Sequence, residues 1–161
     1  MDLSAFYGVV SGINFTLLGL WWVAVRERPE VGVGTAAGRR MAYLVALQFL
    51  IPGTMALLSQ VAPGEPGLWR ASFTIAGLAG AYGSVLLGRS LTRVPGQGLV
   101  AGLIRWGSGL LYLAVAVLAA IPGLTSGWTL SPLQVEAVLL CLLVFLGVHA
   151  AWVVAMVPKE T

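Results

Sequence analysis

Residues 98–121, GLVAGLIRWGSGLLYLAVAVLAAI, form an apolar stretch that is long enough to cross a lipid bilayer. A helix of about 20 residues covers a hydrocarbon core of about 30 Å, because each residue adds about 1.5 Å. The stretch contains one charged residue, Arg105. An arginine at mid-bilayer costs roughly 2.5–3.5 kcal/mol on insertion scales. The sequence therefore predicts a membrane-spanning helix whose arginine either reaches the lipid headgroups or has a function inside the membrane.

The composition of the whole chain is that of a membrane protein. Its 161 residues are 58% hydrophobic and only 9% charged, and the mean hydropathy is +0.92. A soluble domain of this size could not bury so much apolar surface in its own core. The net charge of +3 comes mainly from arginines between apolar stretches, which is typical of cytoplasmic loops and not of a nucleic-acid-binding face. We therefore expect the lipid bilayer as a partner and no nucleic acid.

Four further apolar stretches complete a predicted all-α integral membrane protein, a bundle of five transmembrane helices in a single domain. The predicted spans are residues 5–25, 41–62, 71–88, 98–121 and 132–157. Most basic residues then fall on one side of the membrane: Arg26, Arg28, Arg39, Arg40, Arg89, Arg93 and Lys159. Arg70 falls on the other. The positive-inside rule places the N-terminus outside and the C-terminus in the cytoplasm, so we expect a multi-pass protein of the cytoplasmic (inner) membrane.

A set of polar side chains at comparable depth is the candidate site. Arg105 of the fourth span, Gln48 of the second and His149 of the fifth fall at similar depth when the helices are laid side by side, and Asn14 lies near the middle of the first. This layer is rich in hydrogen-bond donors and has no carboxylate, so it would suit an anion or a polar headgroup better than a cation. Two simpler interpretations stay open. Arg105 reaches the headgroups, or Gln48 and the backbone carbonyl freed by Pro52 satisfy it within the bundle.

The remaining ionisable residues do not indicate catalysis or metal binding. One histidine, one cysteine (Cys141) and no pair of carboxylates in any span predict no metal site, no haem and no other cofactor. Glu136, about one turn into the fifth span, is interpreted as a charge that favours the N-terminal end of a helix. Ser108 and Tyr112 have no base beside them at helical spacing, so we assign no catalytic residue.

Small residues predict where helices pack closely. Gly8 and Gly12 form one GxxxG pair, and Gly98 and Gly102 form another. The third span carries a ridge of small residues at every fourth position: Ala76, Gly80, Ser84 and Gly88. Such surfaces let helix backbones approach each other in a membrane. Three of them are more than a bundle of this size needs, so we expect some to face a neighbouring subunit or another membrane protein.

Two functional hypotheses from different classes follow. The first is a homo-oligomeric channel or transporter for a small solute, with an anion favoured and the Arg105 layer lining the site. The second is an accessory or structural subunit that packs its small-residue faces against a larger membrane complex. A third, ranked last, is an intramembrane enzyme that acts on lipid, for which the same layer would have to supply the active site.

Overall fold

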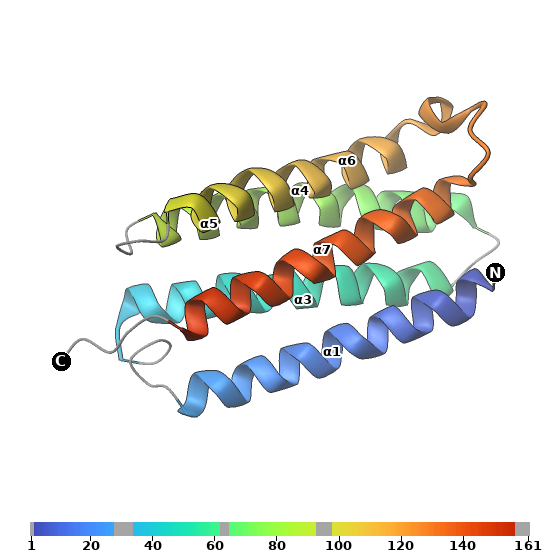
Figure 1. Cartoon of the computed structure of the whole chain (residues 1–161). Helices are drawn as coiled ribbons and strands as arrows, with labels where there is room; N and C mark the ends of the chain where they lie inside the picture. The colour runs from blue at the N-terminus through green and yellow to red at the C-terminus, as the bar shows by residue number, and fades with distance from the viewer. Residues whose placement is uncertain (1, 28–33, 62–64, 93–97, 157–161) are drawn as a thin grey trace.

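The computed structural model describes residues 2–27, 34–61, 65–92 and 98–156, and it is helical in all of its regular structure over these ranges (Figure 1). Five helices are long and apolar enough to cross a membrane. They are α1 (Leu3–Glu27), α3 (Ala36–Val61), α4 (Pro66–Leu91), a composite of α5 (Gly98–Gly102), η1 (Leu103–Ser108) and α6 (Gly109–Ala120), and α7 (Pro132–Ala155). A short 3-10 helix, η2 (Pro122–Thr125), precedes α7. The predicted five-helix transmembrane bundle is confirmed.

The helices extend beyond several of the predicted bounds. α3 begins at Ala36 and α4 at Pro66, both inside stretches predicted as loops. Hydropathy detects only the part of a helix that lies in hydrocarbon, whereas polar end turns continue into the headgroup region. The fourth span also differs from a regular α-helix, because η1 is a π-helical turn and includes Arg105. The predicted ends at residues 62 and 157 lie outside the described residues.

Local sequence signals mark the helix starts. The Asp2 carboxylate accepts the backbone N–H groups of Ser4 and Ala5, at 3.0 and 3.3 Å, at the start of α1. At the start of α7, the Ser131 hydroxyl accepts from the Gln134 N–H while the Gln134 side chain accepts from the Ser131 N–H. These caps pair N–H groups that a helix leaves without an internal partner. They place the beginnings of the first and last spans.

α7 packs against three of the other spans. Neighbours in the chain pack side by side from α1 to α3, α3 to α4 and α4 to α6, while α7 contacts α3, α6 and α1. In Figure 1, α7 lies in front of α3, between α6 and α1, and α1 begins at the opposite end of the bundle from the end of α7. We call the end that holds residue 2 the N-terminal end. The other, where Arg26, Arg39, Arg40 and Arg89 lie, is the arginine-rich end.

The core has two apolar clusters. One, toward the arginine-rich end, includes Val45, Leu87, Ile104 and Val154, and the other, toward the N-terminal end, includes Met55, Phe73, Tyr112 and Leu140. Four buried polar side chains from four different spans lie where the clusters meet. We call them the polar belt: Asn14 (0% exposed), Gln48 (1%), Ser84 (0%) and Ser108 (1%). The belt is near the middle of the bundle.

The predicted ridge on α4 packs inside the same chain. The Tyr112 ring covers Gly80, and the Arg105 side chain covers Gly88. A Cβ atom at Gly77 would stand 2.7 Å from the Tyr112 carbonyl oxygen, so the backbones of α4 and α6 touch there. Ser84 is buried in the belt, and Ala76 is half-buried. The ridge is therefore an internal packing surface.

Most glycines of the two GxxxG pairs, unlike the ridge on α4, are not covered by another helix. Gly8 faces the Gln60 side chain of α3, with 3.4 Å between the Gln60 Oε1 atom and an added Cβ. At Gly12, Gly98 and Gly102, an added Cβ would meet no atom of the described residues within 4 Å. These three glycines leave their helix surfaces open.

Candidate functional site

Gln48 occupies the centre of the bundle between α4 and α7. The Ser84 hydroxyl donates to its Oε1 atom over a long 3.5 Å, and a Cβ atom on Gly147 would lie 3.3 Å from the Gln48 Cβ. The backbone carbonyl of Gln48, which Pro52 deprives of its usual helical donor, also faces Gly147. The side-chain Nε2 atom is buried without a hydrogen-bond partner. A buried donor left unpaired costs about 1–3 kcal/mol of folding free energy, so an acceptor that paired with the Gln48 Nε2 atom would stabilise the bundle.

Asn14 brings the complementary group from α1. It is fully buried, and its Nδ2 atom donates to the Val10 carbonyl at 2.8 Å. The side chain lies against α3, since a Cβ on Gly53 would stand 3.0 Å from the Asn14 Cβ. The Oδ1 atom is buried without a partner. Gly53 is five residues from Gln48 on α3, so the unused Asn14 acceptor lies about 7.5 Å along the helix axis from the Gln48 backbone, toward the N-terminal end.

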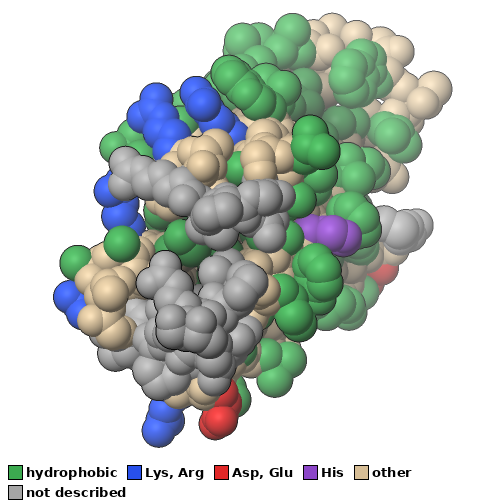
Figure 2. Space-filling model, turned by 60° about the vertical axis from the view of Figure 1, so that its left-hand side comes forward, with side chains coloured by type: hydrophobic (Ala, Val, Ile, Leu, Met, Phe, Trp, Pro, Cys, Tyr) green, Lys and Arg blue, Asp and Glu red, His purple; other side chains and the backbone are tan. Residues whose placement is uncertain are grey.

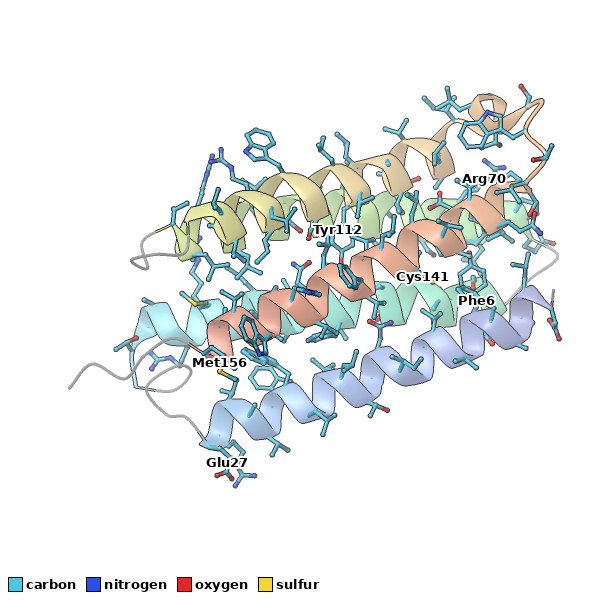
Figure 3. The ribbon with its side chains drawn as sticks, in the orientation of Figure 1. Phe6, Glu27, Arg70, Tyr112, Cys141 and Met156 are labelled. Atoms are coloured by element: carbon cyan, nitrogen blue, oxygen red, sulfur yellow. The ribbon has the colours of Figure 1, made fainter. Side chains whose placement is uncertain are left out.

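Tyr112 adds a third unused group, from α6. Its side chain is 0% exposed and its hydroxyl has no hydrogen-bond partner. Figure 3 shows Tyr112 near the middle of the bundle, and Ser108 of the polar belt lies one turn away on the same span. A phenolic hydroxyl both donates and accepts. Three helices thus offer unused hydrogen-bonding atoms from neutral side chains: Asn14 Oδ1, Gln48 Nε2 and the Tyr112 hydroxyl.

Arg105 lies closer to the arginine-rich end than Gln48 does. Its Cβ and Cα pack on Gly88, which precedes Arg89, whereas Gln48 faces Ser84. Ser84 and Gly88 are one turn apart on α4, or about 6 Å. The half-buried Arg105 guanidinium lies 4.9 Å from the centre of the Trp106 ring, and its Nε atom is buried without a partner. The predicted layer is therefore offset by one turn between these two residues.

His149 does not join this site. Gly147 is the residue of α7 that faces Gln48, and residue 149 is rotated by about 200° from it. The His149 side chain is exposed, its Nδ1 atom pairs with the Phe145 carbonyl at 2.9 Å, and its ring centre lies 4.3 Å from that of Phe145. Figure 2 shows the histidine on the surface among hydrophobic side chains.

An apolar groove lies on the same side of the bundle as His149. It has a volume of about 250 Å³ and lies between α1 and α7, with Phe49 of α3 at its floor. The lining residues on the two outer helices include Leu17, Leu20, Trp21, Val148, Ala151 and Trp152. The groove is open to the surroundings of the bundle, so it suits an apolar group that approaches from the membrane.

Glu136 is the residue that sequence reasoning missed. Its side chain is 1% exposed, and both carboxylate oxygens are buried without a hydrogen-bond partner. Tyr7 of α1 and Arg70 of α4 lie within electrostatic range of it. The sequence-based interpretation was a charge that favours the N-terminal end of a helix, whereas the structure buries this side chain inside the bundle. The signal was present, because Glu136 is the one acidic residue inside the predicted apolar spans.

In the part of the chain that the structure describes, no group of three or more histidine, cysteine, aspartate or glutamate side chains could hold a metal ion.

Comparisons with known protein families, curated proteins and solved structures found no match for this chain. The five apolar helices define the class as a polytopic α-helical membrane protein. Its more specific function has to be argued from the buried polar groups.

Proposed function

We propose that this protein binds a small polar solute at the polar belt and passes it across the membrane. The observation that carries the proposal is the set of unused hydrogen-bonding atoms on α1, α3 and α6 at mid-depth. Buried polar atoms in folded proteins nearly always have partners, so unpaired ones call for an occupant. Solute sites of membrane transporters also lie near the bilayer midplane. A solute that both donates and accepts could pair with these atoms in turn as it passes.

The chemistry of the belt favours a neutral solute over the anion that the sequence suggests. Asn14, Gln48 and Tyr112 are uncharged, and Arg105 lies about one turn from Gln48 toward the arginine-rich end, whereas Asn14 lies toward the N-terminal end. An ion in this position would lose its hydration without gaining an opposite charge. Water and small molecules with hydroxyl or amide groups match the unused donors and acceptors.

His149 and the groove beside it support self-association. A polar side chain within a membrane span rarely faces lipid, so the exposed His149 supports the proposal that another chain covers this face. With Nδ1 engaged by Phe145, the Nε2 atom is the one left to reach outward. The Phe145 carbonyl can only accept, so Nδ1 donates to it, and the Nε2 atom of the neutral ring is then an acceptor that needs a donor from the covering chain. We propose that the covering chain is a second copy of this protein.

The solute proposal is tested in reconstituted vesicles by stopped-flow light scattering, with water, glycerol and urea as probes and chloride as the anionic comparison. We expect wild-type vesicles to equilibrate faster than protein-free vesicles for at least one neutral probe. Asn14→Leu and Gln48→Leu should abolish the difference, while Gly12→Ala, at an open position, should leave it unchanged. Equal rates in wild-type and protein-free vesicles for every neutral probe would overturn the proposal.

Self-association is tested by coexpressing two copies with different affinity tags. We expect both tags to be recovered together, and His149→Leu to reduce that recovery. Trp22→Leu, on the exposed surface of α1, is the matched control and should leave the recovery unchanged. Recovery of one tagged copy with a stoichiometric foreign protein, and without the other tag, would favour the accessory-subunit reading instead.

A further inference from the structure

The geometry at the N-terminal end of the bundle points to a second site, separate from the polar belt. We propose that Glu136 is a proton-binding site. Its carboxyl group is neutral in the enclosed arrangement that the structure shows and ionised when it pairs with Arg70. Nothing in this proposal depends on solute passage at the belt.

The burial of Glu136 carries the first step. Both carboxyl oxygens are enclosed, and no hydrogen-bond donor of the residues that the structure describes reaches either of them. An isolated carboxylate in such a place loses its hydration and gains no compensating partner, whereas a neutral carboxyl group loses far less. The enclosed conformation therefore fits the protonated acid.

Tyr7 offers a hydrogen-bond acceptor for the O–H group of the protonated Glu136. The Tyr7 hydroxyl donates to the Leu133 carbonyl of α7 at 2.8 Å, which holds the phenol next to the turn that carries Glu136. Its oxygen still has lone pairs to accept a hydrogen bond. The Tyr7 ring packs edge-on against Phe73 of α4, with ring centres 6.3 Å apart, so the phenol is held between α1, α4 and α7.

Arg70 is the group that can stabilise the ionised form. It lies at the N-terminal end of the bundle (Figure 3), where it donates to the Ala119 carbonyl of α6 at 3.2 Å and lies 4.8 Å from the Trp69 ring centre. Its field acts on the Glu136 carboxyl, although no direct pair joins the two residues within the described structure. A guanidinium has five donors, so Arg70 can turn from Ala119 to a carboxylate. Arg70 bonded to the Ala119 carbonyl thus corresponds to protonated Glu136, and Arg70 turned toward Glu136 corresponds to the ionised carboxylate.

The other ionisable groups near this site do not compete for the proton. On α7, Cys141 is exposed at the surface of the bundle. Within α6, the single ionisable side chain is Tyr112, which lies deeper, against Gly80. The ionisable side chains of α3, namely Arg39, Arg40 and Tyr43, lie at its arginine-rich end. Among the described residues, Tyr7 and Arg70 are the ionisable groups that lie within electrostatic range of Glu136.

The test uses dicyclohexylcarbodiimide, an apolar reagent that reacts with protonated carboxyl groups, on the full-length protein in lipid vesicles. Labelled peptides are quantified by mass spectrometry across a pH series. We expect Glu136 to react strongly at neutral and acidic pH, and to lose reactivity as the pH rises. Glu27 and Glu65, both exposed, are controls within the same chain and should react weakly at neutral pH. This comparison needs no variant, so it does not depend on the folding of one.

Two variants test the role of Arg70. In Arg70→Gln the stabilising charge is gone, so labelling of Glu136 should persist to higher pH, by about one unit or more. Arg70→Lys keeps the charge and should shift the profile much less. Equal reactivity of Glu136, Glu27 and Glu65 at every pH would overturn the proton-binding site. An unchanged profile in Arg70→Gln would overturn the pairing with Arg70.

Discussion

The aromatic ring of Tyr112 lies directly against Gly80, at the point where α4 and α6 come closest to backbone contact. Gly77, nearly one turn away on α4, faces the Tyr112 and Ala116 backbone. This contact buries Tyr112 completely and so holds its unpaired hydroxyl inside the bundle. Packing of small residues against one large ring thus positions a candidate binding group.

Gly80→Ala should destabilise the bundle. The new methyl group would overlap the Tyr112 ring, and overpacking of a buried site typically costs about 1–3 kcal/mol. Gly102→Ala is the matched control, because no atom lies within 4 Å of the added group and alanine favours a helix. Unfolding in mixed micelles with increasing denaturing detergent measures both variants. Equal stability of the two would show that α6 can move away from α4 at little cost.

Asn14 and Gln48 should be energetically coupled. If one occupant bridges the Asn14 acceptor and the Gln48 donor, replacing both residues by alanine will cost a different amount from the sum of the single changes. The expected interaction energy is about 0.5–3 kcal/mol from a double-mutant cycle in the same unfolding assay. Thr16→Ala, combined with Gln48→Ala, is the control, because Thr16 is exposed and bonds only its own helix, at the Gly12 carbonyl. Additive effects of Asn14→Ala and Gln48→Ala would mean that the two groups have no common partner.

Arg105→Leu should retain passage of neutral solutes. The guanidinium lies near the arginine-rich end and on the Trp106 ring, apart from the level of Gln48. Removing the charge also removes an insertion cost of up to about 2.5–3.5 kcal/mol, so we expect unchanged or higher stability. Vesicle flux and detergent unfolding of the same preparation measure both quantities. Loss of neutral-solute flux in a folded Arg105→Leu protein would return Arg105 to the solute site.

The orientation in the membrane stays a prediction from the distribution of basic residues. After Cys141 is replaced by serine, single cysteines at Thr35 and Ser126 are introduced, which lie in segments at opposite ends of the bundle. In intact cells, an impermeant thiol reagent should label the cysteine at position 126 and leave the one at position 35 unlabelled. Both should react after the cells are opened. The reverse pattern in intact cells would invert the topology.

The sequence alone determined the number of spans and their approximate positions. Apolar stretches such as residues 98–121 are local signals, since length and hydropathy decide whether a helix can cross a bilayer. The ridge at Gly80 and Gly88 was also visible, because small residues at every fourth position share one face of any helix. What covers that ridge could not be predicted from the spacing.

Only the tertiary structure decided which way each polar side chain points. α7 is apolar on nearly all sides, so its sequence carries no amphipathic signal for its rotation about its own axis. Packing decides that rotation. Gly147 faces Gln48, and the angle of about 100° per residue then turns His149 outward. Glu136 is turned inward to the enclosed site beside Tyr7 and Arg70 by the same packing. Depth in the membrane follows from chain position, but the facing of a side chain depends on contacts between helices far apart in the sequence.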